Sequence, residues 1–250
     1  MARETIDRTP WLVGPRQFIP TAPRLVVLPH AGGGPAFYRS LTQVLEPELA
    51  CWVVHYPGRE RRIADPLPAS LEELADTVAA EISQRIEAPL VLFGHSLGAA
   101  VAHEVALRIP ENILGLIISG RGARTVVKRE QAVHLLSDEA LIEEVCDMNA
   151  TPSEVLAHPE LRSLLLPAIR SDYRIVETHT NDDLTILDIP IITYVGADDP
   201  VTAPDEMDSW AGRTRHLMRQ RVFPGDHFYF ASNLEAVTQA IIHDVSAMME

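Results

Sequence analysis

The pentapeptide Gly94-His95-Ser96-Leu97-Gly98 is the part of the sequence best suited to chemistry. A serine between two glycines at this spacing is typical of a nucleophile on a sharp turn, where the glycines let other backbone approach without Cβ clashes. The apolar run 89–93 precedes the motif, and small residues at 99–102 follow it. The pattern alone is weak, but a strand, a turn and a helix in this order predict that Ser96 is a catalytic nucleophile.

A serine hydroxyl needs a base, and the base must be oriented by a third group. In hydrolases built on such a turn, the chain order is serine, acid, histidine. His227 follows the last apolar run, 220–223, and is the predicted base. The acid is expected after the run 191–195, where Asp198 and Asp199 both stand.

Other candidates for the acid and the base are weaker. Asp226 is adjacent to His227, and neighbours in an extended loop point their side chains in different directions. For the same reason only one of Asp198 and Asp199 can face the histidine. Five of the other histidines downstream of the serine are expected to be ordinary packed or solvated residues: His134, His158, His179, His216 and His243.

An acyl-transfer site also needs N–H donors for the negative oxygen of the tetrahedral intermediate. The N–H of Leu97, which follows the nucleophile, is one expected donor. The glycine-rich loop 28–34 follows an early apolar run, and we assign Ala31 as the second donor. The loop matches neither nucleotide-binding glycine pattern, and the absence of H-E-x-x-H or H-x-H pairs gives no support for a metal hydrolase.

The elements that must position these residues follow from the alternation of short apolar runs with longer helical stretches, which predicts a mostly parallel sheet flanked by helices. The expected helices are 70–87, opened by a capping box at Ser70, then 99–109 and 232–250. The expected strands are 25–28, 51–55, 90–93, 116–119, 191–195 and 220–223. The fold class is therefore α/β, of the α/β-hydrolase type.

Residues 1–250 are expected to form one domain, because 250 residues with 46% hydrophobic side chains suit a single α/β core. The segment 125–183 breaks the alternation, since it holds helical runs and no clear strand. We predict that it is a helical insertion placed as a lid. A purely structural insertion is an equal alternative.

Composition narrows the function further. The net charge of −14 argues against a nucleic-acid partner, and the apolar runs are too short to span a membrane. The first residues lack the apolar core of an export signal, so we expect a cytoplasmic protein. Cys51 and Cys146 stand alone, which supports neither a disulfide framework nor a zinc site.

Basic residues are nevertheless clustered in three places along the chain. Such runs are usually solvated faces, but they are candidates for docking an acidic partner. The clusters are Arg59, Arg61 and Arg62; Arg121, Arg124, Lys128 and Arg129; and Arg213, Arg215, Arg219 and Arg221.

Several stretches together resemble the type II thioesterases that accompany polyketide synthases and nonribosomal peptide synthetases. The serine motif is common to many hydrolases, whereas the Pro-His-Ala-Gly-Gly, Pro-Gly-Arg and Leu-Pro-Ala-x-Arg stretches are more specific. The stretches are Pro29–Gly33, Tyr56–Arg61, Gly94–Ala99, Leu165–Asp172, Gly196–Val201 and Gly225–Phe228.

The resemblance implies an editing enzyme that hydrolyses stalled acyl groups from the 4′-phosphopantetheine arm of acyl or peptidyl carrier domains. It also implies a mobile lid, no cofactor of the enzyme's own, and Asp199 as the acid of the triad. Two alternatives remain: a carboxylesterase or lipase acting on small oxygen esters, and a silent hydrolase fold used as a binding module.

Overall fold

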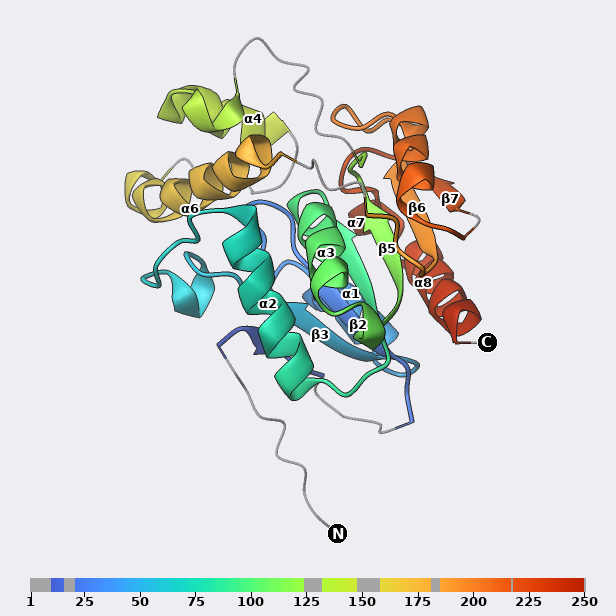
Figure 1. The fold of residues 1–250 in the computed structure, drawn as a ribbon. Coiled ribbons are helices and arrows are strands. Elements are labelled where there is room, and N and C mark those ends of the chain that lie inside the picture. The colour runs from blue at the N-terminus through green and yellow to red at the C-terminus, as the bar shows by residue number, and fades with distance from the viewer. Residues whose placement is uncertain are drawn as a thin grey trace.

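The computed structural model describes residues 10–15, 21–123, 132–147, 158–180, 185–216 and 218–249. A seven-stranded sheet lies at its centre, with the strand order β1-β3-β2-β4-β5-β6-β7 (Figure 1). All neighbouring pairs are parallel except β1 and β3. The strands are Leu12–Val13 (β1), Arg24–Leu28 (β2), Ala50–Val54 (β3), Leu90–His95 (β4), Ile113–Ser119 (β5), Ile191–Gly196 (β6) and Arg219–Phe223 (β7).

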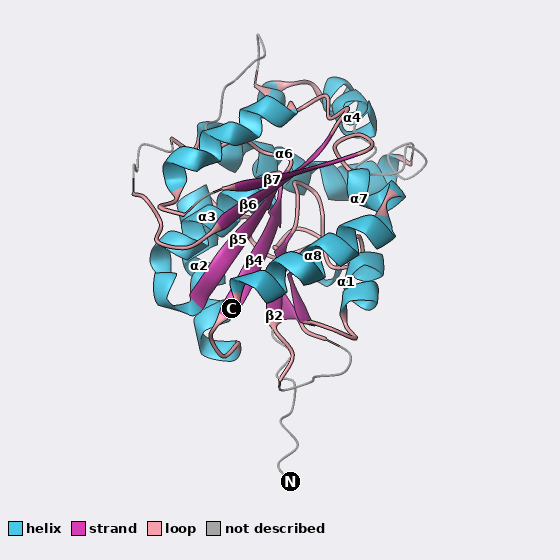
Figure 2. Cartoon of the chain, turned by 90° about the vertical axis from the view of Figure 1, so that its right-hand side faces the viewer, coloured by secondary structure: helices cyan, strands magenta, loops and turns pink. Residues whose placement is uncertain are grey.

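Helices cover both faces of the sheet (Figure 2). Alternate residues of β2 enter opposite cores, because successive side chains of a strand point to opposite faces. Val26 and Leu28 join the core under α2 and α3, while Leu25 and Val27 join the core under α1 and α8. The helices are Arg39–Leu45 (α1), Leu71–Arg85 (α2), Leu97–Arg108 (α3), Tyr229–Ser232 (α7) and Leu234–Met248 (α8). The predicted α/β-hydrolase fold, with helices on both faces of a mostly parallel sheet, is confirmed.

The predicted start of α2 at Ser70 is confirmed, but the Glu73 carboxylate contacts the residue before the cap and not the cap itself. Ser70 Oγ accepts the N–H of Glu73 at 3.2 Å, which satisfies one of the free N–H groups at the helix start. The Glu73 carboxylate accepts the N–H of Ala69, one residue before the cap, at 2.7 Å.

The strand order places a topological switch point at β2. β3 lies on one side of β2 and β4 lies on the other, so the chain winds in opposite directions from this strand. In open parallel sheets such a point leaves a crevice at the carboxyl ends of the strands, where ligands bind. The loop 29–34 after β2 and the serine turn after β4 follow the carboxyl ends of these two adjacent strands.

The described residues between 132 and 180 are helical and include no strand. They form the 3-10 turn Val133–Leu135 and the helices Asp138–Asp147 (α4) and Pro159–Thr178 (α6), which lie at the top of Figure 1, above α2 and α3. A third, smaller core joins them: Val133, Leu141, Val145, Leu166 and Ile169. The role of this insertion as a lid stays a prediction.

Candidate active site

Ser96 stands on a strained turn between β4 and α3. Its backbone has φ 54° and ψ −112°, a conformation that side chains rarely adopt and that costs on the order of 1–3 kcal/mol. The N–H of Ser96 donates to the carbonyl of Ser119 at 2.8 Å, which ties the turn to the end of β5. The turn is therefore held from the neighbouring strand, and the serine lies at the carboxyl edge of the sheet.

The glycines on either side of the serine are required by close backbone contacts. A Cβ on Gly94 would collide with the carbonyl of Gly98, and a Cβ on Gly98 would collide with the carbonyl of Leu28. Because backbone atoms cannot move aside as a flexible side chain can, neither position tolerates a larger residue. The packing thus confirms that these glycines are needed for the close approach of other backbone atoms.

His227 and Asp199 come together at the same edge. His227 Nδ1 lies 2.8 Å from Asp199 Oδ2, and the two residues are 2% and 8% exposed. The second carboxylate oxygen accepts the N–H groups of Val201 and Thr202, at 2.8 and 3.0 Å. The carboxylate is thereby fixed in orientation, and it can hold the imidazole with Nε2 available to a nucleophile.

The two competing carboxylates are directed elsewhere. Asp198 is exposed, with its N–H bonded to the carbonyl of Gly225 at 2.9 Å. Asp226 Oδ1 accepts the N–H of Phe228 at 2.9 Å, a local loop contact. Of the three candidates, Asp199 is the one whose carboxylate contacts His227.

Gly120, at the end of β5, lets two histidines approach each other. It has φ +60°, and a Cβ there would lie 2.7 Å from His95 Cε1 and 3.0 Å from His227 Cε1. The rings of His95 and His227 have centroids 4.7 Å apart. Burial lowers the pKa of His95 well below its usual value and lowers that of His30 to about 3. Both rings are neutral at physiological pH, so they place no positive charge beside His227, and the Asp199 carboxylate is its charged neighbour.

The loop after β2 is fixed around Ala31. The N–H of His30 donates to the Tyr38 hydroxyl at 3.3 Å, and the N–H of Gly32 donates to Asp172 Oδ2 at 2.8 Å. The N–H of Ala31, which lies between them, donates to no acceptor within the described part of the chain. Leu97 opens α3, so its N–H is among the first of the helix, which have no acceptor inside it. The role of these two N–H groups as donors to a negative oxygen stays a prediction.

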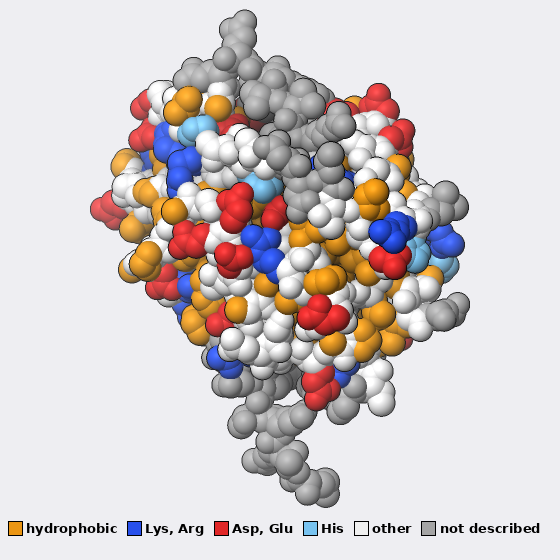
Figure 3. Space-filling model, in the orientation of Figure 1, with side chains coloured by type: hydrophobic (Ala, Val, Ile, Leu, Met, Phe, Trp, Pro, Cys, Tyr) orange, Lys and Arg blue, Asp and Glu red, His pale blue; other side chains and the backbone are white. Residues whose placement is uncertain are grey.

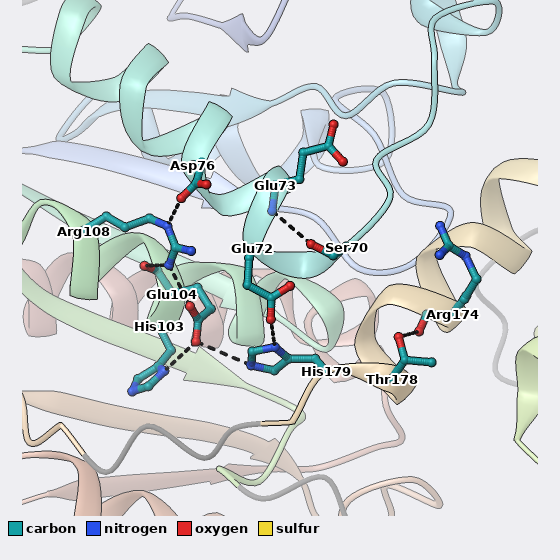
Figure 4. Close-up of polar contacts among 10 residues, drawn as sticks. All are labelled: Ser70, Glu72, Glu73, Asp76, His103, Glu104, Arg108, Arg174, Thr178 and His179. Atoms are coloured by element: carbon teal, nitrogen blue, oxygen red, sulfur yellow. Dashed lines mark hydrogen bonds and ion pairs between the residues drawn. The ribbon is translucent and has the colours of Figure 1, made fainter.

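The remaining histidines belong to other parts of the molecule. His179, just after α6, lies between two carboxylates, with Nδ1 2.7 Å from Glu72 and Nε2 3.4 Å from Glu104 (Figure 4). His134 contacts Glu177 at 2.7 Å, and His216 is largely exposed. His179 is therefore a packed residue that ties α6 to α2 and α3.

The expectation that Arg59 and Arg62 form part of a docking patch is wrong. Arg59 is 3% exposed and paired with Asp172, and Arg62 is 7% exposed and paired with Asp65. Only Arg61 of that cluster is exposed. In the second cluster, Arg124, Lys128 and Arg129 lie outside the described residues. On the face shown in Figure 3, the described basic side chains are scattered among acidic ones and form no continuous patch.

Comparison with known proteins decides the family. The family described as "Thioesterase domain" matches residues 23–245. The chain belongs to the thioesterase family. The enzyme is a thioester hydrolase, and the predicted resemblance to the type II thioesterases of polyketide and nonribosomal peptide pathways is confirmed by its relatives.

Two curated relatives of this thioesterase come from Streptomyces. The "Probable cadicidin biosynthesis thioesterase" of Streptomyces griseus is 36% identical over 88% of this chain, which spans 62% of that protein's length. "Thioesterase PikA5" of Streptomyces venezuelae is 38% identical over 90% of this chain and 81% of its own. The alternative of a small oxygen-ester hydrolase is not favoured by these relatives.

Solved structures of similar proteins agree with the fold over nearly all of the chain. The type II thioesterase BorB from the borrelidin biosynthetic cluster has a TM-score of 0.86 at 35% identity, over 95% of this chain and 98% of that one. YbtT, a type II thioesterase from the yersiniabactin pathway, has a TM-score of 0.86 at 27% identity, over 96% and 100%.

Two features of the thioesterase bear on what it can bind. Within the described residues, no three His, Cys, Asp or Glu side chains are grouped so as to hold a metal ion. None of the described helices is long and apolar enough to cross a bilayer.

Sequence reasoning missed the pairing of Arg59 with Asp172. The two residues are 113 positions apart and both are buried. Both residues lie in the more specific stretches of the family resemblance, which could have indicated a structural role. The neighbouring arginines instead favour a surface charge at Arg59.

Proposed function

We propose that this thioesterase removes stalled or aberrant acyl groups from the phosphopantetheine arm of acyl or peptidyl carrier domains, with Ser96, His227 and Asp199 as its catalytic triad. The observation that carries the assignment is the meeting of the strained Ser96 turn and the His227–Asp199 pair at one edge of the sheet. Relatives named as thioesterases of antibiotic pathways support the class of substrate.

In the first half of the reaction, Ser96 Oγ attacks the carbonyl carbon of the thioester while His227 Nε2 takes the hydroxyl proton. Asp199 holds the imidazole in the required tautomer and stabilises the imidazolium. The negative oxygen of the tetrahedral intermediate accepts hydrogen bonds from the N–H groups of Ala31 and Leu97. Collapse breaks the carbon–sulfur bond, and His227 returns the proton to the departing thiolate.

In the second half, His227 takes a proton from water, and the hydroxide attacks the acyl-serine ester. The same two N–H groups stabilise the second intermediate. Its collapse breaks the bond between the acyl carbon and Ser96 Oγ, His227 returns the proton to that oxygen, and the carboxylic acid is released with Ser96 and His227 restored. A thiol has a pKa of about 8.5, so its thiolate leaves with less help from a general acid than an amine requires. This chemistry calls for no metal or redox cofactor. The pantetheine arm arrives with the substrate.

The partner of the enzyme in this proposal is a carrier domain of a synthase. The enzyme acts in the cytoplasm, on an acidic carrier domain, with neither a nucleic acid nor a membrane as partner. Because the net charge of −14 repels an acidic partner at long range, productive encounter requires local basic groups. With Arg59 and Arg62 buried, Arg61 and the exposed Arg215 and Arg219 are the described candidates.

The test is mass spectrometry of carrier proteins loaded with different acyl groups, before and after incubation with wild-type enzyme or with Ser96→Ala. The wild type should return the carrier to its free-thiol mass, and Ser96→Ala should leave the acyl group in place. A matched oxygen ester of pantetheine serves as the control for substrate class. If Ser96→Ala kept more than a few per cent of the activity, with contamination excluded, the assignment of the nucleophile would be wrong.

A further inference from the structure

Three segments that are far apart in the chain meet at the carboxylate of Asp172, on α6. Oδ2 accepts the N–H of Gly32, from the loop after β2, at 2.8 Å. The same oxygen is paired with the guanidinium of Arg59, from the loop after β3. Asp172 is 1% exposed. Gly32 and Arg59 belong to the Pro-His-Ala-Gly-Gly and Pro-Gly-Arg stretches, and Asp172 lies two residues after Leu-Pro-Ala-x-Arg, so the three stretches of the family resemblance converge here.

Helix α6 also presses against the glycines of the other two segments. Gly32 has φ +76°, and a Cβ there would lie 2.9 Å from Ile169 Cγ1. Gly58 has φ +83°, and a Cβ there would lie 2.8 Å from the Cβ of Ala168. Side chains at these two positions would push α6 away, so both glycines are needed for Asp172 to reach the loop.

The contact with Gly32 bears directly on the orientation of the Ala31 N–H. The Ala31 N–H belongs to the peptide between His30 and Ala31. The peptide before it carries the N–H of His30, and the peptide after it carries the N–H of Gly32. The first is fixed by Asp172 and the second by the Tyr38 hydroxyl. The peptide that carries the Ala31 N–H is thus held between two fixed neighbours, which sets the direction of its N–H.

Arg59 holds the Asp172 carboxylate in this position. Its guanidinium also donates to the carbonyl of Pro57 at 2.6 Å and lies over the ring of Tyr56, 5.3 Å from the centroid. A buried carboxylate without such a partner would be expensive, because it loses its hydration. The arginine therefore allows a charged acceptor, which binds an N–H more strongly than a neutral one, to sit beside the loop.

Anchoring of α6 alone does not explain this arrangement. Arg174, two residues further along the helix, donates to the carbonyls of Ala69 and Pro68 at 2.8 and 3.0 Å and ties α6 to the start of α2. His179 adds a second tie, to Glu72 and Glu104. These contacts hold the helix without touching the loop after β2.

We propose that Asp172, supported by Arg59, is a positioning residue for hydrolysis: it fixes the Gly32 amide and so aims the Ala31 N–H at the negative oxygen of the tetrahedral intermediate. This inference rests on the proposed function, in which Ala31 is one of the two donors. It makes helix α6 part of the reaction machinery.

The test compares two double variants that differ only in the acceptor offered to Gly32. Both carry Arg59→Met, which removes the buried positive charge, and replacing a buried ion pair by uncharged groups of similar size is often tolerated. Asp172→Asn keeps a carbonyl oxygen for the N–H of Gly32, whereas Asp172→Leu removes it. Arg174→Ala is the matched control, since it loosens α6 at a distance from the loop.

We expect Arg59→Met with Asp172→Leu to lower kcat about 100-fold, as for loss of one oxyanion donor, with KM for an acyl-pantetheine changed less than about 3-fold. The asparagine partner should stay within about 10-fold of the wild type, and Arg174→Ala within about 3-fold. Inhibition by an alkyl trifluoromethyl ketone, whose adduct places a negative oxygen in the same site, should weaken about 100-fold only in the leucine variant. If the leucine variant fails to fold, Asp172→Ala in the same background takes its place.

Ser96→Ala is measured in parallel, so that two kinds of failure can be told apart. An active Ser96→Ala would overturn the proposed function and this inference with it. An inactive Ser96→Ala, together with leucine and asparagine variants of equal kcat and equal inhibition, would overturn this inference alone. Equal losses in the leucine variant and in Arg174→Ala would assign Asp172 to the anchoring of α6 and would also reject it.

Discussion

The sheet edge that carries Ser96 and the junction of α6 with α2 and α3 both contain largely buried histidines, in opposite electrostatic environments. At the edge, burial lowers the pKa of His30 to about 3 and that of His95 well below its usual value. At the junction, hydrogen bonding to Glu104 is the largest cause that raises the pKa of His179, with a further contribution from Glu72 (Figure 4).

The difference follows from how each region is held. The serine turn at the sheet edge is fixed by backbone hydrogen bonds and glycine contacts, and the neutral rings of His30 and His95 pack beside it. The junction is fixed by charged side chains, among them the Arg108 pairs with Glu104 and Asp76. We therefore expect changes at the edge to affect catalysis or folding strongly, and changes at the junction to have small, pH-dependent effects.

The largest effect is expected from the acid of the triad. Asp199→Asn should preserve the fold but favour the wrong tautomer of His227, lowering kcat by up to about four orders of magnitude, as in serine proteases. Asp198→Asn and Asp226→Asn are the matched controls and should each cost much less, because neither carboxylate contacts the His227 ring in the described structure. Steady-state kinetics on an acyl-pantetheine thioester measures all three. If Asp198→Asn lost activity while Asp199→Asn kept it, Asp198 would be the acid of the triad in place of Asp199.

The second effect concerns the backbone contacts of the serine turn. Gly98→Ala should lower the free energy of unfolding by about 3 kcal/mol, since its Cβ would collide with the carbonyl of Leu28. Gly212→Ala is the control, because a Cβ at Gly212 meets nothing within 4 Å, and it should change stability by less than about 0.5 kcal/mol. Urea denaturation compares the two. Equal stability of both variants would contradict the close packing of the turn.

The third effect is a loss of stability in acid that originates at the sheet edge. The unfolded chain binds a proton at His30 below about pH 6.5, whereas the native protein does so only near pH 3. Stability therefore falls as the pH falls through this window, by on the order of 2 kcal/mol between pH 7 and pH 5. His30→Gln should flatten the dependence of the unfolding free energy on pH by that amount. An unchanged slope would mean that His30 does not stay neutral in the folded protein.

The smallest effect, of opposite sign, is expected at the junction. A raised pKa means that His179 stabilises the native state below its unfolded pKa near 6.5, and that this contribution is lost as the pH rises through the folded pKa. His179→Gln should thus destabilise the protein at pH 5.5 but hardly at pH 9. Because Glu72 is half exposed, solvent screening limits the effect to about 1 kcal/mol. A larger loss of unfolding free energy at pH 9 than at pH 5.5 would contradict a raised pKa of His179 in the folded protein.

The two regions also differ in how much the sequence could predict. The strands β2 to β6 were predictable because burial on both faces gives near-continuous apolar runs. The partly exposed β7 carries a weaker signal, and the two-residue edge strand β1 and the short α1 leave none. The positions of Ser96, Asp199 and His227 could be predicted because each follows a strand at the same sheet edge.

Long-range charge pairs could not be predicted in this way. A run such as Arg59–Arg62 has the composition of a solvated face. Only the packing shows that Arg59 points toward Asp172 on α6 and that Arg62 points toward the His55 carbonyl and the Trp11 ring. The carboxylates that hold His179 come from two other helices, so sequence spacing carries no information about them.

The central claim, that Ser96 is a nucleophile activated by the His227–Asp199 pair, is tested most directly by labelling with a fluorophosphonate and mapping the modified peptide by mass spectrometry. The account predicts one label per chain, on Ser96, with thioester hydrolysis lost in proportion to labelling, and labelling slowed strongly in Asp199→Asn but hardly in Asp198→Asn. A label on another residue, or full hydrolysis by enzyme labelled at Ser96, would contradict it.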